Sequence, residues 1–200
     1  TGVQTCALPI WRLLEAGAPQ PIRAGDLDRF AAAARAAPAA QPAAAPRAEI
    51  GHAGAEVPAA PLAAFLDWLA SETGGEARRG ETLAAFAAAA FREATGAARV
   101  GLALGPVPRA PERRFTDPDR LPLSEIAEAA DAPADLRLRD LGATAITGLR
   151  LGGEATPTLS LSAAGETLRI DYQGALPPDQ AIALLDGFTS RLADPARHLL

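Results

Sequence analysis

The chain has 200 residues and a mass of 20.5 kDa, enough for one ordinary domain or a small domain, a linker and a modest second unit. All 19 basic residues are Arg, and the absence of Lys excludes Schiff-base catalysis by Lys, a phosphate-loop Lys and a Lys-borne biotin or lipoyl arm. The net charge of −5 argues against a broad nucleic-acid surface and leaves only a small basic patch around Arg109, Arg113 and Arg114.

The cysteine content and the lengths of the hydrophobic runs exclude further classes of protein. A single Cys makes no internal disulfide, and no cluster of Cys and His has the spacing of a metal site. The apolar run Ala84–Phe91 is far shorter than a membrane span, and Ala7–Ile10 is too short for a signal-peptide core. We therefore expect a soluble, cytoplasmic protein without a membrane, nucleic-acid or metal partner.

The first ten residues differ in composition from the rest of the chain. Residues 1–10 contain Cys6 but neither Arg nor an acidic residue, and we interpret them as a non-native segment. A disordered natural terminus is the alternative. A reactive thiol needs an electropositive setting, which this segment does not supply, so Cys6 receives no functional role.

A short helix and a spacer are predicted next. Asp26–Arg35 opens with a capping residue and carries Leu27 and Phe30 on one helical face. The Ala/Pro-rich stretch after this helix cannot pack, and we predict a linker over residues 36–60. This assignment makes His52 an exposed loop residue rather than a metal ligand or a base.

Hydrophobic periodicity after residue 60 predicts two helices and a strand. Apolar residues recur at helical spacing in one window that ends near Thr73 and in a second over Glu81–Ala94. Alternating apolar residues then predict a buried strand over Val100–Leu104. The charged, proline-bearing stretch Arg109–Arg120 predicts a loop, and Leu123–Ala130 predicts another short helix.

The last third is richer in strand signals. Apolar alternation predicts strands at Leu136–Leu138, Leu159–Ser162 and Leu168–Tyr172, the last two forming a hairpin, and β-branched residues predict one at Thr144–Leu151. An amphipathic helix comes after Pro177-Pro178 and ends before Pro195. Helices around a hairpin-containing sheet predict an α/β fold, a two-layer sandwich with a mixed sheet.

Three stretches of the sequence carry a resemblance to a known family. One, Gly17–Leu27, precedes the spacer, and the other two, Leu138–Gly142 and Leu168–Leu200, follow it. They resemble, in that order, the end of the peripheral-subunit-binding domain, the Ser-Asn-Leu-Gly segment, and the closing strand and helix of the dihydrolipoyl acyltransferase component of 2-oxo acid dehydrogenase complexes. The resemblance implies a remnant of the subunit-binding domain at residues 11–35. It also implies a shortened acyltransferase-like domain of the chloramphenicol-acetyltransferase type at residues 61–200.

The chain departs from this family where the chemistry would lie. Family members carry Asp-His-Arg-x-x-Asp-Gly after the closing strand, and the resemblance implies that the His deprotonates the thiol of coenzyme A or dihydrolipoamide. Here Tyr172 is followed by Gln-Gly-Ala-Leu-Pro-Pro-Asp, so that Gly174 stands at the His position and Pro178 at the Asp position, with Asp179 one residue on. We therefore assign no catalytic and no cofactor-binding residue.

Other candidate groups have simpler explanations. His198 is the remaining His of the domain, but it lies beyond the Pro that ends the last helix, so we do not expect it to act as the base. Ser160 and Ser162 alternate with apolar residues, which indicates a half-exposed strand rather than oxyanion donors. Glu125 and Glu128 share a predicted helix face that solvent would cover.

Three candidate functions are consistent with these observations. We expect a non-catalytic acyltransferase-like subunit of a 2-oxo acid dehydrogenase complex, a homo- or hetero-trimer whose partners are acyltransferase core chains and dihydrolipoamide dehydrogenase. A first alternative is an active CoA-dependent dihydrolipoyl acyltransferase that uses His198 or a base from a neighbouring chain. A second is a fragment of a condensation-type acyltransferase whose His-His motif lies outside the chain. Coenzyme A is implied only by the first alternative, and without Lys no lipoyl group is expected.

Overall fold

The computed structural model describes residues 49–73, 78–106, 111–149, 151 and 155–199, together with Gly25 and Asp28. The chain divides after residue 47 into two units, and the described residues from 49 onward belong to the second. Asp28, inside the predicted first helix, is helical. The predicted non-native segment, the spacer at residues 36–48 and nearly all of the subunit-binding remnant lie outside the described residues.

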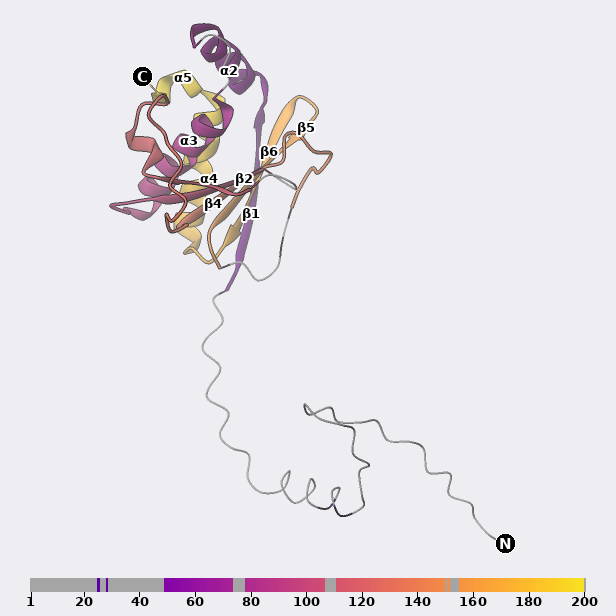
Figure 1. Ribbon diagram of the computed structural model, residues 1–200. Helices are drawn as coiled ribbons and strands as arrows, with labels where there is room; N and C mark the ends of the chain where they lie inside the picture. The colour runs from indigo at the N-terminus through magenta and orange to yellow at the C-terminus, as the bar shows by residue number, and fades with distance from the viewer. Residues whose placement is uncertain are drawn as a thin grey trace. The chain divides into compact units, whose positions relative to one another are not determined.

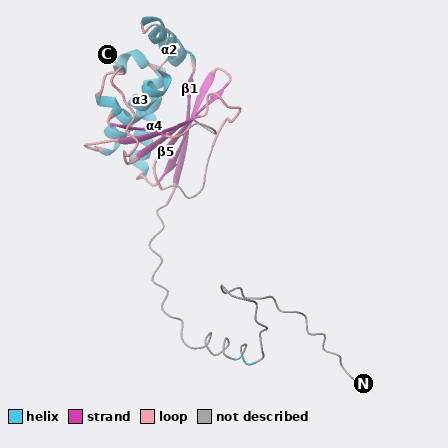
Figure 2. Ribbon diagram, viewed as in Figure 1, coloured by secondary structure: helices cyan, strands magenta, loops and turns pink. Residues whose placement is uncertain are grey.

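The second unit combines one mixed sheet with helices packed on it (Figures 1 and 2). Its elements are, in chain order, β1 (Gly51–Pro58), α2 (Ala60–Glu72), α3 (Arg79–Thr95), β2 (Gly101–Pro106), β3 (Arg113–Thr116), the 3-10 helix η1 (Pro118–Arg120), β4 (Leu136–Asp140), β5 (Thr158–Ala164), β6 (Thr167–Gly174), α4 (Pro178–Ala193) and α5 (Pro195–Leu199). The six strands lie in the order β1-β6-β5-β4-β2-β3. Strand β4 runs parallel to both of its neighbours, and the other pairs are antiparallel.

One face of the sheet is apolar and is covered by α3 and α4. On β6 this face carries Leu168, Ile170 and Tyr172, all part of the buried core. Helix α3 is rich in buried Ala, and these short side chains let α4 approach closely: a Cβ on Gly187 would lie 3.4 Å from the Cβ of Ala90. The predicted helices that correspond to α2, α3 and α4 and the alternating strands β2, β4, β5 and β6 are confirmed.

The opposite face is polar, and the chain between β4 and β5 crosses it. The Ser162 hydroxyl donates to the Thr147 carbonyl at 3.1 Å, and the Gln173 side-chain amide donates to the carbonyl of Leu151. Ser160 and Ser162 are only 3% and 1% exposed, so the prediction of a half-exposed strand is wrong. The sequence pattern shows which residues share a face, but not that a later segment covers it.

Two strands lie where the sequence predicted a linker and a loop. Strand β1 falls inside the predicted linker, because its inward residues are only Ala and Val, a composition close to that of the spacer. Strand β3 falls inside the predicted loop Arg109–Arg120. It is fixed by the buried ring of Phe115 and by antiparallel pairing with β2, neither of which its charged local sequence reveals.

Two predicted elements are absent from the described residues that should form them. The stretch Leu123–Ala130 is not helical. The Glu125 N–H donates to the carbonyl of Pro122, and the Ala129 N–H donates to the carbonyl of Arg114 in β3. Within Thr144–Leu151 the described residues form bends and irregular structure rather than a strand. There the Thr144 hydroxyl bonds the Leu141 carbonyl and offers the backbone an alternative to a strand ladder. No helix in the described part of the chain is long and apolar enough to cross a membrane.

Candidate functional site

The resemblance noted in the sequence places the family's catalytic histidine at Gly174, the last residue of β6. Gly174 is buried and lies opposite Gly51 of β1. A Cβ placed on Gly174 would lie 2.7 Å from the Cα of Pro157 and 2.9 Å from the hydroxyl oxygen of Tyr172. Real Cβ contacts essentially never come closer than 3.0 Å, so the backbone around Pro157 would have to shift to admit any side chain. The site therefore has no room for an imidazole.

Tyr172 occupies the space beside this position. Its side chain is 1% exposed, and its hydroxyl oxygen accepts a hydrogen bond from the backbone N–H of Leu176 at 3.1 Å. Burial raises the pKa of the Tyr172 phenol, since the phenolate would lose its hydration. The group thus stays protonated in the neutral range.

The residues aligned with the family's second carboxylate lie in the first turn of α4. Pro178 is the first residue of that helix, and the Ala181 N–H donates to the carbonyl of Pro177. Asp179 is exposed in the same turn, where a negative charge favours the helix N-terminus. Asp179 therefore has a structural explanation at the start of α4.

His198 lies at the other end of α4. The helix has 16 residues, which corresponds to a length of about 24 Å. It starts four residues after Gly174, whereas α5, which carries His198, comes after its last turn (Figure 1). The structure therefore does not bring His198 to the Gly174 position.

His52 is much closer to this position than its predicted place in a linker implied. It lies on β1 directly opposite Gln173, one register step from the Gly51–Gly174 pair. Successive side chains of a strand point to opposite faces, so the His52 side chain lies on the polar face, and a side chain at position 174 would lie on the helix face. The prediction that His52 is exposed is confirmed, and the prediction that it lies in a loop is wrong.

The polar face carries a small cavity of about 350 Å³, lined by Thr147–Leu149, Arg169 and Asp171. Asp171 is 3% exposed, and its carboxylate lies 3.2 Å from the Arg169 guanidinium. The hydrogen bond to Asp171 raises the pKa of Arg169. Because a guanidinium already engages this carboxylate, the arrangement is that of a structural ion pair rather than of an acid–base catalyst.

The segment similar to the family's Ser-Asn-Leu-Gly motif anchors α3 to β4. The Asp140 carboxylate accepts two hydrogen bonds from Arg79, at 2.7 and 3.1 Å. It also accepts the N–H of Gly142 at 3.0 Å. These contacts join the first turn of α3 to the end of β4 and fix the chain as it leaves the sheet.

Two members of the predicted basic patch, Arg113 and Arg114, form ion pairs with acidic residues. The third member, Arg109, lies outside the described residues. Arg113 bonds both Glu81 and Glu128, and Arg114 bonds Glu112. Burial alone would raise the pKa of Glu81, but the hydrogen bond and charge of Arg113 leave it below its ordinary value. Glu128 is thus an ion-pair partner of Arg113, and not only a solvated side chain.

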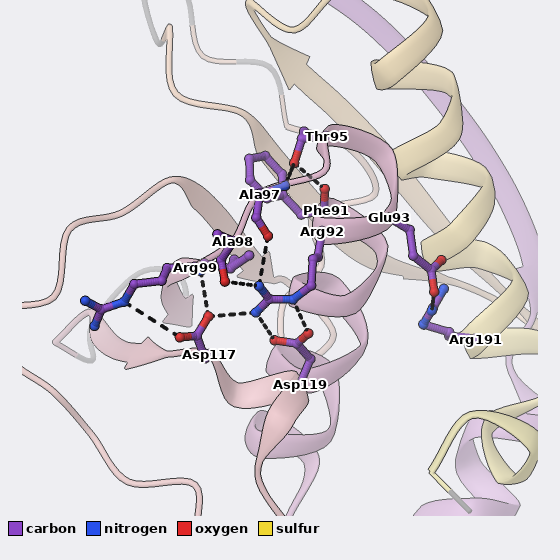
Figure 3. A network of polar contacts seen from close by, with 11 residues as sticks. Phe91, Arg92, Glu93, Thr95, Ala97, Ala98, Arg99, Asp117, Asp119 and Arg191 are labelled. Carbon is purple, nitrogen blue, oxygen red and sulfur yellow. Dashed lines mark hydrogen bonds and ion pairs between the residues drawn. The ribbon is translucent and has the colours of Figure 1, made fainter.

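The most extensive polar network surrounds Arg92 at the end of α3 (Figure 3). Its guanidinium bonds Asp119 at 2.8 Å, Asp117 at 2.6 Å and the carbonyls of Ala97 and Ala98. Asp117 has a left-handed backbone, φ 47°, and also accepts the N–H of Val100. The hydrogen bond to Asp119 raises the pKa of Arg92. Burial opposes this effect but does not outweigh it. The network fixes the entry into β2 and η1, and its groups are all engaged with one another.

An apolar groove of about 850 Å³ lies between α2, residues 121–124 and residues 193–196. Trp68 and Leu121 line it and are 51% and 41% exposed. Its mainly apolar lining suits contact with an apolar group better than acid–base chemistry. Within the described residues no group of three or more His, Cys, Asp and Glu is placed to hold a metal ion.

No protein-family model and no curated protein sequence matches the chain. Solved structures do match it. The cubic core of a pyruvate dehydrogenase multienzyme complex is 15% identical, with a TM-score of 0.59, over 77% of this chain and 85% of that one. A dihydrolipoamide acetyltransferase from Azotobacter vinelandii is 16% identical, with a TM-score of 0.58, over 77% and 85% of the two chains.

A third similar structure is the epimerization domain from the third module of tyrocidine synthetase B. It is 11% identical, with a TM-score of 0.50, and the match covers 75% of this chain but 48% of that chain. At these identities the likeness establishes the fold. The chain therefore has the mixed-sheet α/β sandwich of dihydrolipoamide acetyltransferase core domains, which confirms the predicted chloramphenicol-acetyltransferase-like fold class.

Proposed function

We propose that the chain is a non-catalytic, acyltransferase-like subunit of a 2-oxo acid dehydrogenase complex, where it co-assembles with active acyltransferase chains. The observation that carries this proposal is the closed space at Gly174, where the backbone of Pro157 leaves no room for a side chain. A pseudo-subunit can lose the base and keep the fold, because the sheet and the helices do not depend on an imidazole at that point.

The missing base has a direct chemical consequence. Transfer of an acyl group to coenzyme A or dihydrolipoamide needs a thiolate, since the neutral thiol is a poor nucleophile. Removal of a general base costs roughly a hundred- to ten-thousand-fold in rate. Neither described histidine replaces it: the side chain of His52 lies on the opposite face, and His198 lies beyond the far end of α4.

The assembly part of the proposal rests on the likeness to a chain from the cubic core of a pyruvate dehydrogenase multienzyme complex. Acyltransferase core chains, in a homo- or hetero-trimer, are the proposed direct partners. Dihydrolipoamide dehydrogenase is the proposed partner of residues 11–35. A lipoyl group does not fit this chain, because the family attaches it to Lys and the sequence contains none.

Co-expression with an active dihydrolipoamide acetyltransferase tests the proposal. The chain should co-purify with the tagged acetyltransferase core, and turnover per active chain should not increase. Separate elution of the two proteins at micromolar concentration would remove the assembly part. Transfer activity of the chain alone would remove the non-catalytic part.

A fragment of a condensation-type enzyme is the second candidate. It is favoured by the match to the epimerization domain, which covers 48% of that chain and 75% of this one. Sequencing of the gene upstream of this segment separates the two candidates. A His-His-x-x-x-Asp-Gly sequence in the same reading frame would favour the condensation-type fragment, and a lipoyl or subunit-binding domain there would favour the acyltransferase-like subunit.

A further inference from the structure

Strand β1 is an outer strand of the sheet, with β6 on one side. On its other side no strand of the described residues pairs with it. It is eight residues long and every residue pairs with β6 in unbroken register. Proteins usually protect a long, regular edge strand with bulges, charged side chains, Pro or a covering segment, since its free N–H and C=O groups recruit other strands. In β1 these devices are confined to Glu56 and Pro58 near one end.

The alternation of hydrogen bonds along β1 shows which of its backbone N–H and C=O groups face away from β6. The N–H of Ala59 donates to the Glu166 carbonyl at 2.9 Å, on the same register as the β1–β6 ladder. In an antiparallel pair such bonded positions alternate with unbonded ones, so Ala53, Ala55 and Val57 bond to β6. The backbone N–H and C=O groups of His52, Gly54 and Glu56 therefore point away from the sheet.

The side chains of β1 alternate between the two faces of the sheet. His52, Gly54 and Glu56 are exposed, whereas Ala53, Ala55 and Val57 are half-buried towards the helices. Pro58, which has no N–H to donate, falls on the outward phase, where proline is tolerated at a sheet edge. The outward edge thus offers a short, regular set of donors and acceptors centred on Gly54.

This edge is complementary to itself. If two copies meet antiparallel about a two-fold axis at Gly54, each His52 lies opposite Glu56 of the other copy, because the two residues are equally distant from Gly54. An imidazole N–H then faces a carboxylate on the polar face, on both sides of the axis. Glu56 already lies opposite Arg169, and His52 opposite Gln173, so the new pairs would extend existing polar rows.

We propose that β1 is an interface for a second copy of this chain, in which the two β1 strands pair antiparallel about Gly54 and join both sheets into one. The symmetric edge gives an isologous contact, the type that closes as a dimer. This contact does not depend on the proposed function, because it needs neither an acyltransferase partner nor the absence of catalysis.

Proline at position 56 tests the backbone part. Analytical ultracentrifugation of the full chain should show a concentration-dependent dimer, and Glu56→Pro should abolish it with an unchanged circular dichroism spectrum. Ala55→Pro is the matched control: it removes a bond to β6 and should destabilise the fold itself. The absence of any dimer over the concentration range, or a dimer that persists in folded Glu56→Pro, would overturn the proposal.

Charge exchange tests the register without relying on proline. His52→Glu should place two carboxylates opposite each other and Glu56→Lys a cation opposite the imidazole, and each should weaken the dimer about tenfold. The double variant places Glu opposite Lys on both sides of the axis and should recover the lost affinity. Failure of the double variant to recover it would exclude this register and with it the two-fold contact at Gly54.

Discussion

The Cα of Pro157, just before β5, lies 2.7 Å from the point where a Cβ on Gly174 would be placed. The obstruction is a backbone atom, so no substitution at position 157 removes it. This contact joins the end of β6 to the segment that leads into β5, and it makes glycine a packing requirement at position 174.

Gly174→Ala should therefore lower the free energy of unfolding by about 1–3 kcal/mol, since the methyl group overlaps with the backbone of Pro157 and with the Tyr172 hydroxyl. Urea denaturation measures the change. Gly105→Ala in β2 is the control, because a Cβ there meets nothing within 4 Å. Equal stability of the Gly174 variant and the native chain would contradict the packing argument.

A histidine introduced at position 174, where the proposed family has its catalytic base, should not create acyl-transfer activity. Gly174→His places a large side chain where Pro157 and Tyr172 already lie, so we expect a destabilised protein without acyl transfer. The measurement is thiol-dependent loss of acetyl-CoA, followed with the native chain in parallel. A folded Gly174→His variant with clear turnover would show that the site retains the rest of its catalytic arrangement.

The network around Arg92 should be the polar cluster most important for stability. Arg92→Ala leaves the carboxylate of Asp119, 7% exposed, without its guanidinium partner, and breaking such a buried pair costs about 3–5 kcal/mol. Arg92→Lys should restore only part of this, since an ammonium cannot bond both carboxylates and both carbonyls in the same plane.

Arg99→Ala is the control for this cluster. Its side chain is 81% exposed and 3.9 Å from Asp117, so its removal should change the free energy of unfolding by less than about 1 kcal/mol. Denaturation curves for the three variants decide the matter. If Arg92→Ala and Arg99→Ala cost the same, the network does not fix this corner of the fold.

Acidic pH should reduce the stability that the network around Arg92 gives to the fold. The hydrogen bond from Arg92 is the main reason that the pKa of Asp117 lies below its ordinary value of 3.8. The unfolded chain therefore binds a proton on Asp117 before the folded chain does, so this stabilisation is complete above pH 4–5 and disappears as the pH falls through the lower, folded pKa. Asp117→Asn should be less stable at neutral pH and should lose less stability on acidification. Parallel acid dependence of both proteins would contradict this assignment.

Much of the fold can be predicted from local patterns. Helical spacing of apolar residues predicts α2, α3 and α4, and alternation around Gly165 predicts the β5–β6 hairpin, because each pattern reflects its element's geometry directly. Strand β1 escapes this reasoning because its side chains are small and resemble the spacer, so only pairing with a strand more than a hundred residues away reveals it.

For the candidate site too, the sequence predicts some features, whereas others depend on long-range contacts. The absence of a histidine at position 174 is visible in the sequence, but the contact between Gly174 and Pro157 is long-range and has no local signal. The place of His52 opposite Gln173 depends on recognising β1 as a strand. The buried serines on β5 depend in turn on the chain that crosses the polar face, since alternation alone does not show what covers a sheet.

Acetyl transfer from acetyl-CoA to dihydrolipoamide by the purified full chain tests the central claim most directly. The assay compares the chain, at micromolar concentration, with a protein-free blank and with an active dihydrolipoamide acetyltransferase. We predict a rate indistinguishable from the blank, because no imidazole fits at position 174 and neither described histidine reaches it. A rate that rises in proportion to the concentration of the chain would contradict the account.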